Sequence, residues 1–260
     1  MKGAIIGDIV GSIYEWHNIK TKEFPLFQQR SRFTDDTVMT CAAAKALMEA
    51  SGDEASVVER MTRSMQELGR KYPHAGYGGR FKKWIFLADP EPYHSLGNGA
   101  AMRASPAGFA GASAEDAYRL GELTAMPTHD HPEGLKAAGV TAAVVWMARH
   151  GADREEIRRY AASRYHIPRL DDIRPTYRFD VTCMGTMPVA LAAFLESESF
   201  EDAVRGAISV GGDSDTIGAI TGSFAEAFYG VPEEIWQEAG SRLTAELKDI
   251  VDRFYARGWN

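Results

Sequence analysis

The chain has 260 residues, of which 45% are hydrophobic and 25% are charged, a composition typical of a folded globular protein. Its formal net charge of -7 disfavours a sequence-independent grip on nucleic-acid phosphates, so we expect no stable nucleic-acid binding. No apolar run approaches the roughly 18 residues that a membrane span needs, and an acid, Asp8, arrives too early for the apolar core of a secretory signal.

The first patterned segment, residues 3–11, has two structural interpretations. Gly3, Gly7 and Gly11 recur every four residues, so in a helix they share one face and allow very close packing of a neighbouring element. Residues 4–6 also suit a buried strand that leads into a glycine-rich turn. No GxGxxG pattern follows, and a dinucleotide-binding fingerprint therefore has little support.

Two acidic clusters open helical patterns farther along the chain. The first, Phe33-Thr34-Asp35-Asp36-Thr37, precedes a pattern over residues 37–50, and the second, Gly211-Gly212-Asp213-Ser214-Asp215-Thr216, precedes one over residues 215–229. Each cluster taken alone is explained by helix capping, because Asp and Thr are favoured caps and acids in a first turn complement the helix dipole.

Helical spacing also prevails in the rest of the chain, whereas strand-like alternation is scarce. Further helices are predicted over residues 54–69, 114–125, 132–149, 153–164, 183–195, 199–209 and 232–257. We therefore expect an all-α fold that forms a single compact domain over residues 1–260, and we expect a monomer. The widely spaced Cys41 and Cys183 indicate reduced thiols, which makes the cytoplasm the expected location.

Residues 70–110 differ from this pattern because they are rich in glycine and proline. They include Gly76-Tyr77-Gly78 and the stretch from Ser95 to Gly99. Glycine lets backbone amides approach a ligand closely, and successive N–H groups can cradle a phosphate. Ordinary turns between helices explain the same composition, and the sequence leaves both interpretations open.

Convergence of the two acidic clusters gives them a second interpretation. Carboxylate and hydroxyl oxygens are the ligands that hard cations such as Mg²⁺ prefer. Arg32 is the only basic residue near either cluster, so converging carboxylates would repel one another unless cations neutralised them. Glu15 follows Asp8 by seven residues and adds an acid to the same helical face. His129 and His131 lie two apart, which fits no zinc spacing.

Taken together, these motifs resemble the ADP-ribosylglycohydrolase family, which includes the dinitrogenase-reductase activating glycohydrolases. The matching elements, in order, are Gly7-Asp8-x-x-Gly11-Ser12-x-x-Glu15, Phe33-Thr34-Asp35-Asp36-Thr37, Gly76-Tyr77-Gly78, Gly97-Asn98-Gly99-Ala100-Ala101-Met102-Arg103, Thr128-His129 and Gly211-Gly212-Asp213-Ser214-Asp215-Thr216. Each motif is weak alone, but six in the same order are specific.

The resemblance implies an orthogonally packed helical domain with two Mg²⁺ ions, or Mn²⁺ as a substitute, in a central cleft. The metal ligands that it implies are Thr34, Asp35, Asp36, Asp213, Asp215 and Thr216, one aspartate bridging the ions. The candidates for proton transfer are Glu15, Asp35 and Asp36. The implied substrate-binding residues are Gly76, Tyr77, Gly78, Ser95, Gly97, Asn98, Gly99, Met102 and His129.

The activity that the resemblance implies is hydrolysis of the glycosidic bond between ADP-ribose and an acceptor, with ADP-ribosyl-arginine on protein as the preferred interpretation. Serine, O-acetyl-ADP-ribose and nucleic-acid linkages are alternatives, as are a non-catalytic ADP-ribose-binding module and a metal-dependent phosphoesterase. Leu96 stands where some relatives carry an aromatic residue. The segment from Arg174 to Asp180 either lines the cleft or forms a packed surface loop.

Overall fold

The computed structural model describes residues 1–259, and across that range the regular secondary structure is helical, which confirms the all-α prediction. In chain order the helices are α1 (Lys2–Gly11), α2 (Asp35–Glu49), α3 (Glu54–Lys71), α4 (Gly79–Trp84), α5 (Gly99–Met102), α6 (Ser105–Ala110), α7 (Ala114–Ala125), α8 (Pro132–Arg149), α9 (Arg154–Ala162), α10 (Leu170–Ile173), α11 (Cys183–Leu195), α12 (Phe200–Ile208), α13 (Ser214–Tyr229), α14 (Glu233–Gly240) and α15 (Ala245–Ala256). An isolated β-bridge joins Gly97 and Thr182.

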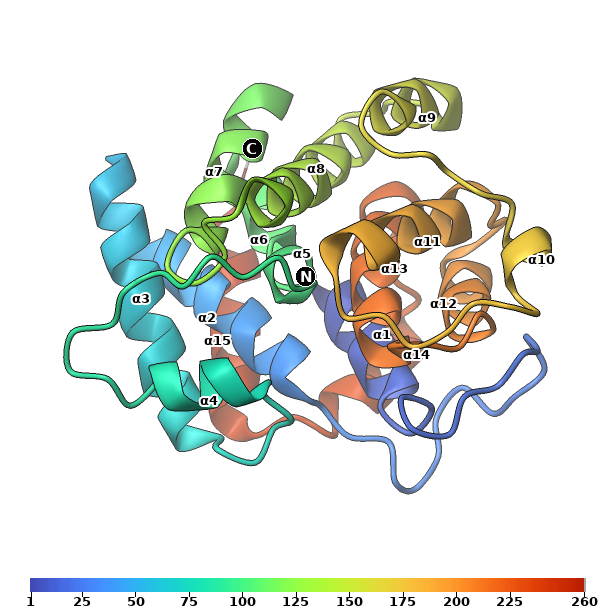
Figure 1. Ribbon diagram of the computed structural model, residues 1–260, viewed down its shortest axis with the longest axis horizontal. Coiled ribbons are helices and arrows are strands. Elements are labelled where there is room, and N and C mark those ends of the chain that lie inside the picture. The colour runs from blue at the N-terminus through green and yellow to red at the C-terminus, as the bar shows by residue number, and fades with distance from the viewer. Residues whose placement is uncertain (260) are drawn as a thin grey trace.

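The segment with glycines every four residues is a helix, α1, and its small-residue face packs on α13. A Cβ atom added to Gly7 would lie 1.9 Å from the carbonyl oxygen of Gly218, and one added to Gly3 would lie 2.0 Å from that of Gly222. Such distances leave no room for a side chain, so the two helix backbones touch. Helices from opposite ends of the chain thus lie side by side in the centre of the molecule (Figure 1).

One predicted helix was wrong. The stretch predicted as one helix over residues 232–257 is two helices, α14 and α15, because the hydroxyl of Thr244 accepts a hydrogen bond from the backbone N–H of Leu247 and starts a new helix. The glycine- and proline-rich region 70–110, for which no helix was predicted, contains the short helices α4, α5 and α6.

The helices enclose one large hydrophobic core and a smaller satellite cluster. In Figure 1, α2, α3 and α4 occupy one side of the molecule and α11 and α12 the other, with α1 and α13 between them. Cys41 and Cys183 are free and buried within the core. None of the helices between residues 1 and 259 combines the length and the apolar character needed to cross a bilayer.

Candidate active site

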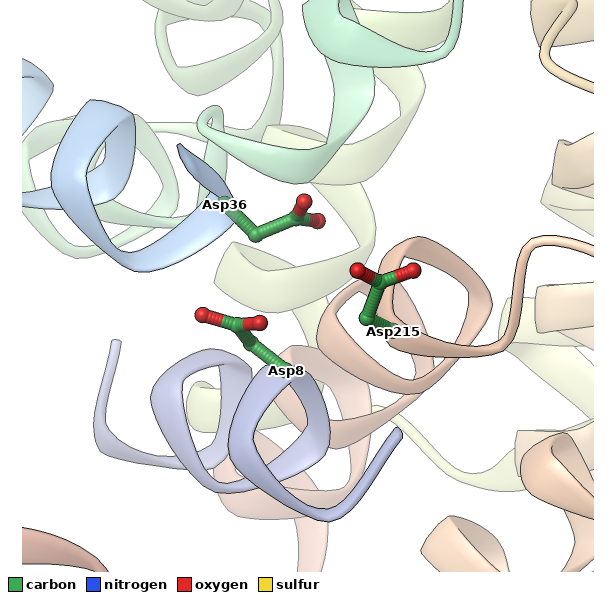
Figure 2. Close-up of side chains that lie close together, drawn as sticks. All are labelled: Asp8, Asp36 and Asp215. Carbon is green, nitrogen blue, oxygen red and sulfur yellow. The ribbon is translucent and has the colours of Figure 1, made fainter. Parts of the chain in front are cut away.

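Three helices direct buried aspartates toward one another. Asp8 comes from α1, Asp36 from the first turn of α2 and Asp215 from the first turn of α13, and their carboxylates face a common point (Figure 2). One oxygen from each lies within 4.8 Å of the others. The convergence of the two acidic clusters therefore comes from the close packing of α1 against α13 and of α2 against α1.

Asp8 fastens the beginning of α2 to α1. Its carboxylate accepts hydrogen bonds from the backbone N–H of Thr34 at 2.9 Å, from the Thr34 hydroxyl at 2.7 Å and from the backbone N–H of Thr37 at 3.1 Å. The sequence placed Asp8 on the helical face of Glu15 but did not include it among the site residues. Its carboxylate belongs to the cluster and caps the N-terminus of α2 from a different helix.

Asp36 has a carboxylate oxygen without a partner. Its Oδ2 accepts hydrogen bonds from the hydroxyls of Thr216 at 3.3 Å and Thr34 at 3.4 Å. Its Oδ1 is buried and has no hydrogen-bond donor among the described residues. A buried, unpaired carboxylate is costly unless a cation balances it, so this donor set suits a hard divalent metal ion.

A second carboxylate set shares one member with the first. Ligand oxygens of Glu15, Asp213 and Asp215 also lie within 4.8 Å of one another. Asp213 is held in place by Asn98, whose side-chain amide donates to its Oδ2 at 2.7 Å. Because Asp215 belongs to both sets, two cation positions bridged by one aspartate are compatible with this geometry.

Burial and mutual repulsion raise the pKa of the acids at this centre. Burial is the main cause for each, and it raises the pKa of Asp8 to about 6, that of Glu15 to about 7 and that of Asp35 to about 8. The pKa values of Asp36 and Asp215 lie well above the ordinary range, from burial first and then from neighbouring aspartates. Without cations, the cluster therefore retains protons near neutral pH.

Asp35 lies at the edge of this centre, not in either close set of oxygens. Its backbone N–H donates to the carbonyl of Ala75 at 2.9 Å, which ties the start of α2 to the Gly76 loop. Gly76 has φ of +122°, and a Cβ atom there would approach Asp35 Oδ1 to 2.8 Å. Glycine is thus required beside this carboxylate by both backbone conformation and space.

A cleft of about 440 Å³ opens over the acidic centre, within the usual size range of small-molecule sites. The predicted site residues that line it are Glu15, Asp35, Asp36, Gly76, Gly78, Ser95, Gly97, Asn98, Gly99, Met102, His129, Asp213, Asp215 and Thr216. Lining residues that the sequence interpretation did not select include Trp16, Arg80, Tyr93, Arg103 and Val181. Most predicted residues therefore do meet in one place.

Two predicted residues do not line the cleft. Thr34 is buried, and its hydroxyl donates to Asp8. Tyr77 is also buried, and its ring packs against Phe81 with centroids 5.2 Å apart. The glycines on both sides of Tyr77 reach the cleft, while Tyr77 itself anchors their loop in the core.

The segment 174–180 divides between two roles. Phe179 lines the cleft and stacks on Trp16, with ring centroids 5.2 Å apart. Tyr177 instead packs against Gly212, where an added Cβ atom would lie 2.5 Å from its ring. Arg174 is not among the residues that line the cleft, and it pairs with Asp171.

Comparison with known proteins identifies the family of this chain. The family model for ADP-ribosylglycohydrolase matches residues 1–260. The chain is 26% identical to the ADP-ribosylhydrolase ARH3 of Mus musculus, covering 92% of this chain and 85% of that protein. It is 27% identical to the ADP-ribosylarginine hydrolase Tri1 of Pseudomonas putida, and the match covers 95% of this chain and 76% of that protein.

A bacterial relative and a solved structure extend the comparison. The ADP-ribosyl-[dinitrogen reductase] glycohydrolase of Rhodospirillum rubrum is 26% identical to this chain, and the match covers 98% of this chain and 93% of that protein. A solved ADP-ribosylglycohydrolase-related protein complex superposes with a TM-score of 0.69 at 26% identity, covering 98% of this chain and 94% of that one. The chain therefore belongs to the ADP-ribosylglycohydrolase family of enzymes.

Proposed function

We propose that the protein is a Mg²⁺-dependent hydrolase that cleaves the glycosidic bond between ADP-ribose and an acceptor and releases free ADP-ribose. The observation that supports this most is the unpartnered Oδ1 of Asp36 beside two carboxylate sets that share Asp215. Two Mg²⁺ ions, or Mn²⁺ as a substitute, fit this donor set. The residues that we propose to hold them are those that the resemblance implies, Thr34, Asp35, Asp36, Asp213, Asp215 and Thr216, together with Asp8, which shares a close set of oxygens with Asp36 and Asp215.

Bound divalent ions would orient the ribose hydroxyls and polarise a water at the anomeric carbon. The residues of the chain supply proton transfer. Glu15 lines the cleft and is half-buried beside the carboxylates of Asp213 and Asp215, so a substrate in the cleft would lie within its reach. We assign it the delivery of a proton to the leaving group, with Asp35 and Asp36 as the alternative proton donors.

The rim of the cleft supports arginine as the acceptor. Trp16 follows Glu15 in the chain, is 73% exposed, and stacks on the 42% exposed Phe179. Exposed aromatic faces attract a planar guanidinium group through cation–π contact and stacking. Serine offers no such group. ADP-ribosyl-arginine on protein is therefore the substrate that we propose, in agreement with the activity for which the relative Tri1, an ADP-ribosylarginine hydrolase, is named.

A product assay tests the reaction. The protein is incubated with ADP-ribosyl-arginine and ADP-ribosyl-serine peptides, with Mg²⁺ or with EDTA, and products are identified by mass spectrometry. We expect free ADP-ribose from the arginine peptide with Mg²⁺ and none with EDTA. Release of AMP would instead indicate a phosphoesterase. If neither peptide is cleaved, O-acetyl-ADP-ribose and an ADP-ribosylated nucleic acid are tested in the same way. A protein that binds ADP-ribose but cleaves none of these substrates would be a non-catalytic binding module.

A substitution at the rim tests the acceptor separately. We expect Trp16→Ala to lower kcat/KM for the arginine peptide by about threefold to 30-fold, the range for loss of a cation–π contact. The affinity for free ADP-ribose, measured by calorimetry, should not change. An equal loss with a serine-linked substrate would contradict the assignment of this aromatic pair to guanidinium recognition.

We further propose that residues 1–260 act as one domain, as a monomer in the cytoplasm. The packing of α1 on α13 supports the first point, because it brings helices from the N-terminal and C-terminal parts of the sequence together at the site. The net charge of -7 remains the reason to expect no stable nucleic-acid partner.

A further inference from the structure

Arg103 is a buried cation for which the structure provides no counter-charge. It follows α5, is 1% exposed, and lines the cleft. None of the carboxylates between residues 1 and 259 forms an ion pair with it, and its Nε has no hydrogen-bond acceptor in that range. A buried, unpaired charge is costly to a fold, so a contribution to ligand binding is a reason for its presence.

The guanidinium of Arg103 reaches His129 by two routes. Its Nη2 lies 3.2 Å from His129 Nδ1 and 2.8 Å from the hydroxyl oxygen of Thr128. Arginine only donates, so Nδ1 must accept in this contact. The Thr128 hydroxyl accepts from Arg103 and is 2.7 Å from Nδ1, which leaves its own proton free to be donated to Nδ1. The Arg103 contact requires the ring proton to be on Nε2, and the Thr128 hydroxyl, which could donate to Nδ1 or accept from it, fits that tautomer as a second donor.

The other ring nitrogen faces the glycine loop of the cleft. A Cβ atom on Gly99 would lie 3.2 Å from His129 Nε2, and one on Gly97 would lie 3.6 Å away. Glycine at these positions leaves the space in front of Nε2 open. No acceptor for Nε2 occurs among the described hydrogen bonds, although His129 is only 6% exposed.

We propose that Arg103 and Thr128 are positioning residues that hold His129 as the Nε2–H tautomer, so that Nε2 is a neutral donor to a diphosphate oxygen of the substrate. The positive charge of Arg103 behind the ring favours an anionic acceptor over a neutral one. The identity of that acceptor rests on the proposed function, whereas the tautomer does not.

Burial and the nearby charge keep the imidazole neutral. Burial first, and then Arg103, lower the pKa of His129 well below its usual value. The ring therefore offers one N–H at all pH values near neutrality, and its donor direction is set by the Arg103–Thr128 contacts and not by protonation.

The tautomer is measured first, in the Mg²⁺-loaded full-length protein labelled with ¹⁵N-histidine. Ring ¹⁵N shifts of the wild type should show His129 as the Nε2–H form, with the exposed His166 as an internal reference. Arg103→Met removes the one group that can only donate to Nδ1, and the Thr128 hydroxyl can accept from Nδ1–H, so the Nδ1–H form should appear. A wild-type Nδ1–H ring, or an imidazolium, would overturn the proposal without any need for a variant.

Ligand binding is measured next, with ADP-ribose and with inorganic pyrophosphate as probes. We expect the His129 Nε2–H proton to shift downfield with either probe, and Arg103→Met to weaken ADP-ribose binding by at least about tenfold, as for lost charge-assisted hydrogen bonds. Thr128→Val, a nearly isosteric change, should fold normally and weaken binding less.

The two probes separate failure of this proposal from failure of the proposed function. If ADP-ribose does not bind but pyrophosphate shifts the Nε2–H proton, the tautomer and its anionic acceptor stand and the proposed substrate is wrong. If ADP-ribose binds and is hydrolysed while the Nε2–H proton does not shift, the positioning role is wrong and the function stands.

Discussion

Asp36 shows how a buried carboxylate can serve function at the expense of stability. Its Oδ1 has no partner, and burial together with Asp8 and Asp35 raises its pKa well above the ordinary value. The folded protein therefore holds a proton on this group that the unfolded chain releases above its ordinary pKa of 3.8. In the absence of metal, the free energy of unfolding therefore falls as the pH rises from 3.8 through the raised pKa of Asp36.

Replacing this carboxylate should stabilise the metal-free protein. We expect Asp36→Asn in EDTA at about pH 8 to gain about 1 kcal/mol, equivalent to about 2–4 °C in Tm for a chain of this size. Below the ordinary pKa of 3.8 the group is protonated in both the folded and the unfolded chain, so the gain should nearly vanish. A metal-free variant less stable than wild type at pH 8, measured by calorimetry, would contradict this view of the site.

Asp215 belongs to both carboxylate sets, and its loss should affect activity far more than folding. We expect Asp215→Asn and Asp35→Asn each to abolish hydrolysis while circular dichroism shows an unchanged helical fold. The rise in the activation free energy of hydrolysis should greatly exceed the ~1 kcal/mol of stability that a lost helix cap costs. Near wild-type turnover in either variant would rule out the assignment of these aspartates to metal binding.

Single residues were predictable where the sequence itself groups them. Asp35, Asp36, Asp213 and Asp215 stand in short acidic clusters, and the structure brings them to one cleft. Asp8 and Arg103 were not selected, because their roles depend on contacts with Thr34 and His129 that only the tertiary structure creates. Both residues stand inside motifs that carry the family resemblance, and this position in a motif was the feature from which a role at the site could have been inferred.

At the level of elements, the contact between α1 and α13 positions the site. We expect Gly7→Ala to destabilise the protein by more than about 2 kcal/mol, because its methyl group would force the two backbones apart. The same separation should weaken Mg²⁺ binding, since it moves Asp8 away from Asp215. Unfolding in urea and calorimetric titration with Mg²⁺ measure the two effects.

Gly206→Ala is the matched control. Gly206 lies inside α12, and an added Cβ atom would meet its neighbours at 3.5 Å or more. The change should therefore be neutral or stabilise by about 0.5–1 kcal/mol through helix propensity. If Gly7→Ala and Gly206→Ala had the same effect, close backbone packing would not be what positions the site.

Helices were predicted well where apolar spacing and caps agree, as for α7, which has the predicted bounds. The prediction failed at residues 232–257, where one continuous pattern hides the cap at Thr244. Single-sequence periodicity also left residues 3–11 open between helix and strand. Only the contact with α13 decides for a helix, and that contact is not local in sequence.

For the whole molecule, metal binding and stability should depend jointly on pH. The raised pKa values, up to about 8 for Asp35, mean that Mg²⁺ must displace protons to bind at or below neutral pH. We therefore expect one cooperative unfolding transition whose Tm rises more on addition of Mg²⁺ at about pH 8.5 than at about pH 5.5. An equal Mg²⁺ effect at both pH values, measured by scanning calorimetry, would contradict metal binding at these acids.

The most direct test of the central claim is to locate the metal ions. Crystals of the protein grown with Mn²⁺ would be examined for anomalous scattering. We predict two peaks in the cleft that share Asp215, one beside Asp36 and the other beside Asp213. The absence of any peak at these carboxylates, in crystals of a protein that hydrolyses its substrate, would contradict the dinuclear site.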